Sequence, residues 1–405
     1  MKIGKFAYKN NLSIDTIRHY MDIALIIPKK QGGQYDFDER CQRDLEDVLS
    51  FKGMGFTLGE IKEIFMFKRF GKLTPYQDED CYREIFNNKY HEIEAKISQL
   101  KYMKERLDDK IKKLGVQDNK KSFQIGIDFK ALNLFRCLSC NGDLMLHEGN
   151  ISNNQIINGK LRCHCGEEYI IEEGILILGN RYIHEDINSD FDYIIDYINF
   201  TDEDYLAKMY ENLEWAYKRI DFKELKNKII LELGSGMGFF LRNIYKDLPE
   251  DILYIAVDHS IARHRFLKSM IEITESRKNI VFICSDFLEI PIKEKSIDVV
   301  LDISGSSNYG FEKEEFLLKL IDCYVKEDAY LIGNYILFKN FTFNSLIEQR
   351  YRKNFILNNI KNEIKKLNYN LIEEKMSDYI DKGGKYESYF NEGERVYGYS
   401  FYGKR

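Results

Sequence analysis

The stretch IILELGSGMG, residues 229–238, decides the fold of the C-terminal half of this chain. Its first five residues are apolar apart from one glutamate, which predicts a short strand buried on both faces. Three alternating glycines follow, and FFLRNIY then opens a helix. Glycine lets the backbone turn sharply and approach a ligand without a Cβ atom in the way. The pattern predicts a strand, a ligand-binding turn and a helix.

A glycine triplet alone is a weak signal, because dinucleotide-binding loops share it. Here the turn starts with the acidic Glu232, which could meet an ammonium group directly or through a water. YIAVD ends at Asp258, where a carboxylate can accept both hydroxyls of a ribose, and NIVFICSD ends at Asp286, within reach of an adenine amino group. The pattern therefore favours S-adenosylmethionine (SAM). The predicted cofactor-binding residues are Glu232, Gly234, Ser235, Gly236, Gly238, Asp258, His259, Asp286 and Phe287.

This series of strands resembles the class I SAM-dependent methyltransferases over about residues 200–405. A fifth strand is expected at AYLIGNYIL, and NYNLIEEKM with RVYGYSFYG is similar to the terminal antiparallel hairpin of that family. The sequence VKEDAYLIG departs from the family, which has a proline-glycine turn there. The resemblance implies a Rossmann-like α/β domain that binds SAM.

No catalytic base stands out in this region. The segment DISGSSNYGF lacks the Pro-Pro-aromatic motif of many amino-group methyltransferases, and Asp302, Asn308 and Tyr309 are the candidates on the expected acceptor side. Methyl transfer can proceed by proximity and alignment alone, so a missing base does not exclude it. The acidic, aromatic residues 179–220 are interpreted as a helical lid suited to a cationic or small drug-like acceptor. A merely solvated helical face is the alternative.

Four of the eight cysteines fall into two pairs, CLSC and CHC. Two thiolate pairs on facing turns supply the tetrahedral sulfur environment that Zn²⁺ prefers, and four protein ligands would make the site structural. Because the second pair is Cys-x-Cys, His164 or His147 could replace one thiolate, and free buried cysteines are the alternative. The predicted metal ligands are Cys137, Cys140, Cys163 and Cys165. A zinc ribbon before such a domain resembles the rRNA guanine methyltransferases that include macrolide-resistance enzymes.

The N-terminal segment predicts two short helices, residues 2–9 and 14–21, joined by a tight turn with Ser13 as a helix cap. Such a helix-turn-helix normally inserts its second helix into the major groove. A hairpin wing that reaches the phosphates would follow. The predicted DNA-binding residues are Thr16, Arg18, His19, Tyr20, Lys29, Lys30 and Tyr35.

The head resembles the MerR family of transcription regulators over about residues 1–114. The matching segments are IGKFA, LSIDTIRHY, LIIP, GGQYDF and GMGFTLGEIKEIF, in that order. Two departures are His19, where the family has tyrosine, and Gln34-Tyr35, where the family has Tyr-Arg and one more phosphate contact. The alternative is a small helical domain with incidental basic residues.

Apolar residues recur at steps of four and three from Phe86 to Leu114, which describes the seam of a coiled coil. In MerR-like regulators the equivalent helix pairs with that of a second subunit, so the resemblance implies a homodimer; packing against the same chain is the alternative. The polar stretch GVQDNKK follows as a linker.

The chain has 405 residues and a net charge of −6, yet residues 1–75 hold 13 Lys and Arg against 10 Asp and Glu. We expect a cytoplasmic α/β multidomain protein without a membrane span or a secretory signal. The predicted domains are a winged helix-turn-helix (1–75), a coiled-coil helix (76–114), a linker (115–130), a zinc ribbon (131–178) and a Rossmann-like methyltransferase domain with its lid (179–405).

Two functional hypotheses follow. In the first, a dimeric regulator binds promoter DNA through its head and binds SAM with a small-molecule acceptor or inducer through its C-terminal domain. In the second, the chain is a working methyltransferase on rRNA or an antibiotic, and its fused head controls its own gene. Both require an intact cofactor turn.

Overall fold

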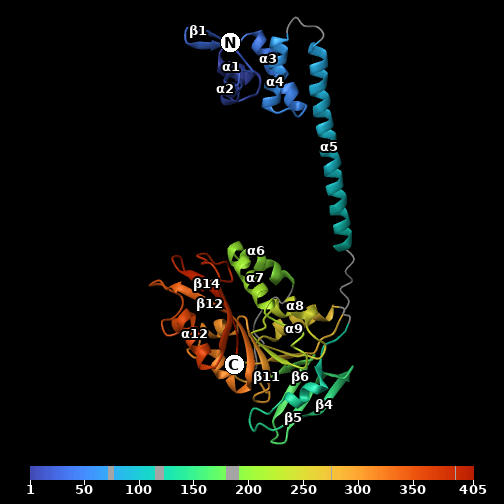
Figure 1. The fold of residues 1–405 in the computed structure, drawn as a ribbon, viewed down its shortest axis with the longest axis vertical. Helices are drawn as coiled ribbons and strands as arrows, with labels where there is room; N and C mark the ends of the chain where they lie inside the picture. Colours follow the sequence, from blue (N-terminus) through green and yellow to red (C-terminus); the bar gives the residue numbers. More distant parts are fainter. Residues whose placement is uncertain (72–76, 115–122, 179–190, 275, 388) are drawn as a thin grey trace. The chain divides into compact units, whose positions relative to one another are not determined.

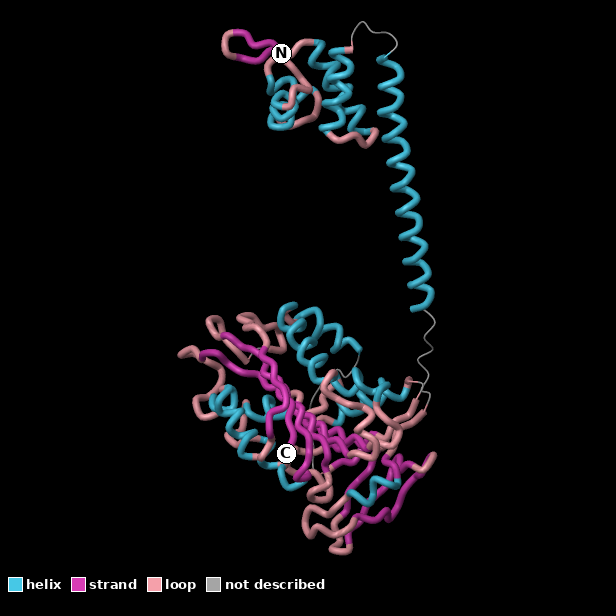
Figure 2. Tube along the Cα trace, in the orientation of Figure 1, coloured by secondary structure: helices cyan, strands magenta, loops and turns pink. Residues whose placement is uncertain are grey.

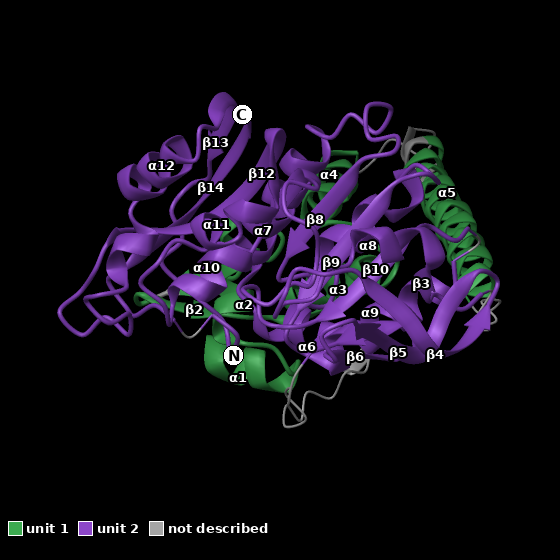
Figure 3. Cartoon of the chain, turned by 90° about the horizontal axis from the view of Figure 1, so that it is seen from below, with its two compact units in different colours: residues 1–118 green, residues 119–405 purple. Residues whose placement is uncertain are grey.

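A computed structural model describes residues 1–71, 77–114, 123–178, 191–274, 276–387 and 389–405. The chain divides into two compact units, residues 1–118 and 119–405, which Figure 3 colours green and purple. Among the described residues, every helix is too short or too polar to cross a membrane.

The first unit is helical apart from one small hairpin. Its elements are α1 (Ile3–Lys9), α2 (Ile14–Asp22), β1 (Lys29–Gln31), β2 (Gln34–Asp36), α3 (Glu39–Gly53), α4 (Leu58–Phe70) and α5 (Gln77–Leu114). The turn before α2 contains Asn11 at a positive φ of 53°, and the Ser13 hydroxyl caps α2 by accepting from the Thr16 amide at 3.0 Å. The helix-turn-helix, its hairpin wing and the long helix are confirmed.

The core of the first unit gathers one face of each short helix. Phe6 of α1 stacks on Phe37 with 4.5 Å between ring centroids, and Ile17 and Leu45 are fully buried beside them. The start of α5 is anchored on this core, because Phe86 packs against Phe51 and Phe56. The remainder of α5 extends away from that anchor as one continuous helix (Figure 1).

The second unit begins with strands and continues as alternating strands and helices. Its first part holds β3 (Ile127–Asp128), the 3-10 helix η1 (Phe129–Leu134), β4 (Leu144–Ser152), β5 (Gln155–Cys163), β6 (Glu168–Glu172) and β7 (Ile175–Ile177). The next part holds α6 (Phe191–Phe200), α7 (Glu203–Tyr217), β8 (Ile229–Leu233), α8 (Phe239–Ile244), η2 (Tyr245–Asp247), β9 (Leu253–Asp258), α9 (Ile261–Glu272) and β10 (Ile280–Cys284). The last part holds β11 (Ile297–Asp302), α10 (Gly305–Gly310), α11 (Leu317–Leu320), η3 (Asp322–Tyr324), β12 (Val325–Asn340), η4 (Arg352–Phe355), α12 (Leu357–Lys366), β13 (Asn370–Met376) and β14 (Arg395–Lys404).

The strands of the second unit form one sheet, drawn in magenta in Figure 2. Its five central strands are parallel and lie in the order β10-β9-β8-β11-β12. Numbered along the chain, this is the doubly wound order 3-2-1-4-5, which reverses between β8 and β11. β14 then pairs antiparallel with β12, and β13 with β14. The Rossmann-like fold and its terminal antiparallel hairpin are therefore confirmed.

Both faces of this sheet are covered. In β9, Tyr254 and Ala256 belong to one hydrophobic cluster, whereas Ile255 and Val257 belong to the cluster on the other face. This two-sided burial explains why the predicted strands are almost continuously apolar. Carboxylates occur where strands end, at the edge that holds the glycine turn.

The cysteine-bearing segment, predicted as a separate ribbon over residues 131–178, is not separate. Its last strand, β7, pairs in parallel with β10, so that Phe282 lies opposite Ile175. Its core residues, among them Leu161, pack in the same cluster as Leu231 of β8. This pairing satisfies backbone groups of β10 that would otherwise be unpaired at a sheet edge, so the segment is part of the central sheet.

The predicted linker, residues 115–130, is also too long. Residues 115–122 lie outside the described part of the chain, but Ile125 and Ile127 are fully buried in the second unit. The Ile125 amide donates to the buried carboxylate of Glu272 at 2.9 Å, and β3 pairs with β5. Residues 123–130 therefore belong to the second unit.

Candidate functional site

The exposed face of α2 and the wing carry most of the predicted DNA-binding residues. Arg18 and His19 are exposed on α2, and Thr16 is half-buried at its first turn. The Arg18 guanidinium lies 3.1 Å from the Asp15 carboxylate on the same face. An exposed arginine and histidine on the second helix of a helix-turn-helix are available to a DNA groove.

The wing presents cations on its first strand. Lys29 and Lys30 are exposed on β1, and Lys30 Nζ lies 5.8 Å from the centroid of the Tyr35 ring on β2. Lys29 pairs loosely with Asp38, at 4.0 Å. These side chains are free to approach phosphate oxygens.

Tyr20 corrects the predicted list. Its side chain is only 2% exposed, and its hydroxyl accepts from Lys52 Nζ at 3.4 Å. It lies three positions after the buried Ile17, which is the spacing of one helix face. Tyr20 is thus a core residue of the head, and this spacing could have revealed it.

The apolar seam of α5 is exposed in the single chain. Beyond Lys89, which pairs with Glu60 and Glu92 at 2.7 Å each, the helix leaves the head. The exposed apolar residues of this helix are Tyr90, Ile93, Ile97, Leu100, Tyr102, Met103, Leu107, Ile111 and Leu114. A seam of this length in water is the surface that a second helix covers in a coiled coil.

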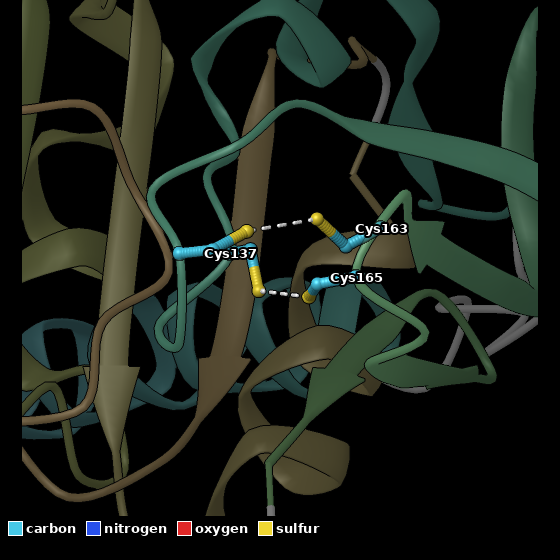
Figure 4. Close-up of side chains that lie close together, drawn as sticks. Cys137, Cys163 and Cys165 are labelled. Carbon is cyan, nitrogen blue, oxygen red and sulfur yellow. Dashed lines mark hydrogen bonds between the residues drawn. The ribbon is translucent and has the colours of Figure 1, made fainter.

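The four predicted metal ligands lie together, as Figure 4 shows for the three labelled cysteines. All four sulfur atoms fall within 4.8 Å of one another. Cys137 and Cys165 are 3.6 Å apart, and Cys140 and Cys163 are 3.3 Å apart. These spacings fit four thiolates around one ion, and the four are free thiols in the structure.

The two histidine alternatives lie differently. His164 Nδ1 is 3.5 Å from the Cys163 sulfur, at the rim of the cluster, whereas His147 Nε2 lies beside Arg162. Because four sulfurs already converge, the set needs neither imidazole. The shortened Cys-x-Cys turn works because Gly166 takes a positive φ of 96°, where its amide donates to the Cys163 carbonyl.

The glycine turn after β8 is held by close packing. Gly234, Gly236 and Gly238 all have positive φ values between 51° and 71°. At Gly238 a Cβ atom would collide with the side chain of Leu267 on α9. The turn therefore needs glycine both for its backbone angles and for helix-to-turn contact.

Two predicted carboxylates serve this turn. Asp258 is buried, and its two oxygens accept from the amides of Gly236 at 2.8 Å and Ser260 at 2.9 Å. Carboxylate oxygens can accept further bonds, so this arrangement leaves room for ligand hydroxyls. Glu232 is also buried, one of its oxygens has no hydrogen-bond partner, and burial raises the pKa of its carboxyl to about 8.

The adenine-side candidates follow the ends of β9 and β10. Asp286 is exposed and accepts from the Leu288 amide at 3.1 Å, and the Phe287 ring lies against Gly234. His259 Nδ1 lies 3.9 Å from Asp258. These residues lie around the same turn, as predicted from the ends of parallel strands.

A cavity of about 420 Å³ opens beside the turn. Its wall includes Glu232, Gly234, Ser235 and Gly236, which sequence analysis predicted. Asp258, His259, Asp286, Phe287 and Gly238 do not line it, although they surround the same turn. Sequence analysis missed a second group of lining residues: Tyr193, Tyr197, Tyr205, Lys208, Asn212, Asn334, Tyr335, Tyr386, Glu387 and Tyr389.

Some of these missed residues lie in a segment with a recognisable sequence pattern, and others do not. The acidic, aromatic composition of residues 179–220 predicts a helical lid; residues 179–190 lie outside the described part of the chain, and α7 packs on β12 and β14. Tyr386, Glu387 and Tyr389 come from the loop between β13 and β14, which carried no recognisable pattern. Only folding brings this loop against α6.

Of the three candidates on the acceptor side, one lines the cavity and two do not. Asn308 and Ser304 line the cavity, and Tyr309 packs edge-on against Phe287 outside its lining. Asp302 is fully buried, accepts from the Ser306 amide at 2.8 Å and does not line the cavity. Burial raises its pKa to about 6. Asp302 therefore caps α10 from inside, and its expected position facing the acceptor is wrong.

Several solved structures are similar to about half of this chain. The MccD protein matches 48% of this chain and 96% of its own with 12% identity and a TM-score of 0.38. The cyclopropane synthase MmaA2 from Mycobacterium tuberculosis matches with 9% identity and a TM-score of 0.36, over 48% of this chain and 83% of its own. A SAM-dependent methyltransferase from Methanosarcina mazei matches with 11% identity and a TM-score of 0.33, over 46% and 97%.

The head has relatives at the level of sequence. The family model described as MerR HTH family regulatory protein matches residues 1–67. The HTH-type transcriptional regulator HmrR from Rhizobium leguminosarum bv. viciae is 30% identical over 113 residues, which are 27% of this chain and 81% of that relative. With its helix-turn-helix, wing and long helix, the chain belongs to the MerR HTH family of regulatory proteins.

Proposed function

We propose that this protein is a dimeric MerR-type regulator whose second unit binds SAM and a small molecule beside the glycine turn. The observation that carries the proposal is the buried Glu232, whose unpartnered oxygen belongs to the wall of a cavity formed by the turn itself. A buried carboxylate oxygen without a partner is costly unless a ligand supplies one. The ammonium group of the cofactor's methionine end would do so.

The residues around the turn fit the rest of SAM. Asp258 would accept the ribose hydroxyls while its amide bonds fix the turn, and Asp286 with Phe287 would flank the adenine. When bound, SAM supplies a methyl group on a positively charged sulfur. The chain's own residues would orient the acceptor, because Ser304 and Asn308 line the cavity and offer a hydroxyl and an amide.

The cysteine cluster would hold Zn²⁺. Four thiolates leave no open coordination position, so the ion would stabilise the fold and take no part in chemistry. Its place in the same sheet as the glycine turn supports a structural role.

The head would bind promoter DNA through Arg18, His19, Lys29, Lys30 and Tyr35, and the α5 seam would pair two subunits. A ligand shifts DNA binding only by its different affinity for two conformations. The proposal therefore requires that SAM or the acceptor change operator affinity. A working methyltransferase on rRNA or an antibiotic remains the second candidate, since the same cavity would serve it.

Calorimetric titration of SAM and S-adenosylhomocysteine into the purified chain tests the cofactor site. We expect micromolar binding that is weakened at least about a hundredfold in Asp258→Ala, because a buried carboxylate that orders the turn and accepts hydroxyls is removed. Asp251→Ala, an exposed aspartate before β9, is the control and should bind like the parent protein. A folded parent protein that binds neither ligand would refute the SAM proposal.

A further inference from the structure

One part of the cavity wall is built largely of tyrosines, and it lies near the glycine turn, because Tyr197 packs on Phe239 with 5.7 Å between ring centroids. We name Tyr193, Tyr197, Tyr205, Tyr386 and Tyr389, together with Glu387, the tyrosine cage. All six residues line the cavity, and they come from α6, α7 and the loop between β13 and β14. The cage is therefore assembled only by the tertiary fold.

Three of the rings form a close group. The Tyr386 centroid lies 5.4 Å from those of both Tyr193 and Tyr197, and the latter two lie 6.3 Å apart. A cation beside such a group can lie within about 6 Å of several centroids at once, where ring quadrupoles attract it. One such contact already exists on the outside, where Lys385 Nζ lies 5.3 Å from the Tyr386 centroid.

Beneath the rings lies a carboxylate. Glu387 is only 3% exposed; one of its oxygens accepts from the Gly384 amide at 3.1 Å and the other from the Thr201 hydroxyl at 3.4 Å. Within the described parts of the chain, it forms no ion pair with a lysine or arginine. These neutral donors orient the carboxylate but leave its charge uncompensated, and a buried charge of this kind calls for a cation.

The cationic groups of the cavity wall are already paired with other carboxylates. Lys208 Nζ lies 3.3 Å from Glu211 and 3.2 Å from Asp378, and the Arg263 guanidinium lies 3.9 Å from Asp258. Glu387 is therefore the acidic group of the cage that a ligand would have to balance.

Three of these tyrosines, Tyr197, Tyr205 and Tyr389, carry no charge at neutral pH. Burial, together with the nearby carboxylate of Glu387, raises the pKa of Tyr197 and Tyr389 well above the ordinary value. Burial likewise raises the pKa of Tyr205 to about 12, although its hydroxyl lies 2.6 Å from that of Tyr389. The cage thus offers neutral ring faces around one carboxylate.

We propose that the tyrosine cage binds an organic ammonium group, so that the small-molecule ligand of the second unit is an amine. This inference rests on the proposed function, because it names the ligand class for the same cavity. Aromatic faces and a buried carboxylate together distinguish a charged ammonium from a neutral group of the same shape. The cage concerns binding and serves a sensor or an enzyme alike.

Choline and its uncharged carbon isostere, 3,3-dimethylbutan-1-ol, form a matched pair of probes. Each is titrated into the full chain by ligand-observed NMR, with and without saturating S-adenosylhomocysteine. We expect choline to bind at least about tenfold more tightly than the isostere, since one tenfold step corresponds to a single moderate cation–π contact. Equal binding of the two probes, or binding of neither, would overturn the inference.

Two variants and two controls locate the effect. Glu387→Gln removes the charge but keeps the shape, and Tyr386→Leu removes a ring that is only half-buried, so that its loss is tolerated by the fold. Both should weaken choline about tenfold or more and leave S-adenosylhomocysteine within about threefold. Glu392→Gln and Tyr210→Leu change exposed residues of the same types and should change neither affinity.

The same titrations separate this inference from the proposed function. If S-adenosylhomocysteine binds but choline behaves like its isostere, the amine proposal fails while the cofactor site stands. If neither SAM nor S-adenosylhomocysteine binds, the cofactor proposal fails, and the choline titration without cofactor still tests the cage. If the cage variants weaken SAM but not S-adenosylhomocysteine, the cage serves the sulfonium of the cofactor, and the amine proposal is wrong.

Discussion

At the scale of single residues, burial affects the two carboxylates beside the glycine turn differently. Glu232 and Asp258 lie at the ends of neighbouring strands, yet only Asp258 has both oxygens bonded to backbone amides. Burial raises the pKa of Glu232 to about 8, so that in most ligand-free molecules the Glu232 carboxyl is protonated at pH 7.

We predict that SAM binding at pH 7 releases close to one proton, because a ligand ammonium favours the ionised form of Glu232. Calorimetric titration in two buffers of different ionisation enthalpy measures that proton. Glu232→Gln should abolish the release and weaken binding, and a parent protein that releases no proton would contradict the assigned role.

The same shift has a consequence for stability. The pKa of Glu232 is about 8 in the folded state and 4.5 in the unfolded state, so the folded state holds this proton more tightly. The stability that the bound proton contributes is fully present below pH 4.5 and is lost as the pH rises through 8. In the absence of ligand, Glu232→Gln should therefore raise the melting temperature relative to the parent protein at pH 8 but not at pH 4.

At the scale of elements, α5 shows what a sequence pattern can and cannot establish. Steps of four and three predicted one long helix with an apolar seam, and the helix spans Gln77–Leu114. Its exposed Ile97 and Leu100 lie within that seam. That the α5 helix of a second subunit covers this seam stays a prediction.

We predict that Leu100→Asp converts a dimer into a monomer. Each dimer would lose two buried leucines, each contributing about 1.5–3 kcal/mol, so the dissociation constant should rise at least about a hundredfold. Sedimentation equilibrium measures it. Gln99→Asp adds the same charge beside the seam and should leave the dimer intact; a dimer that survives Leu100→Asp would argue against pairing through this seam.

At the scale of the whole second unit, the strands that carry the cysteine cluster and the strand that precedes the glycine turn belong to one sheet. β7 pairs with β10, and Cys137 and Cys163 pack in the same core as Leu231 and Val281. Loss of a metal at the cluster should therefore lower the stability of the whole second unit.

We predict that Cys140→Ser loses bound zinc and lowers the melting temperature of the second unit by about 10 °C or more, since a structural zinc site contributes several kcal/mol. Cys323→Ser, an exposed cysteine outside the cluster, is the control and should change neither zinc content nor melting. A separate low-temperature transition of the cysteine-bearing segment alone would contradict the shared core.

Local patterns predicted much of this fold. Ser13 and the apolar faces of α1 and α2 specified the helix-turn-helix, and the apolar runs of β8 and β9 specified strands buried on both faces. The boundaries between units were harder, because nothing local in Ile175–Ile177 reveals that these residues pair with a strand about a hundred positions later.

Local sequence was enough to predict most helices and strands, the glycine turn with its acidic residues and the pairing of cysteines, because each depends on neighbours within a few positions. Only folding buries Asp302, adds the cysteine-bearing segment to the central sheet and packs Tyr386 of the β13–β14 loop against α6. These features depend on contacts between residues distant in the chain. Such contacts leave no periodicity in the sequence.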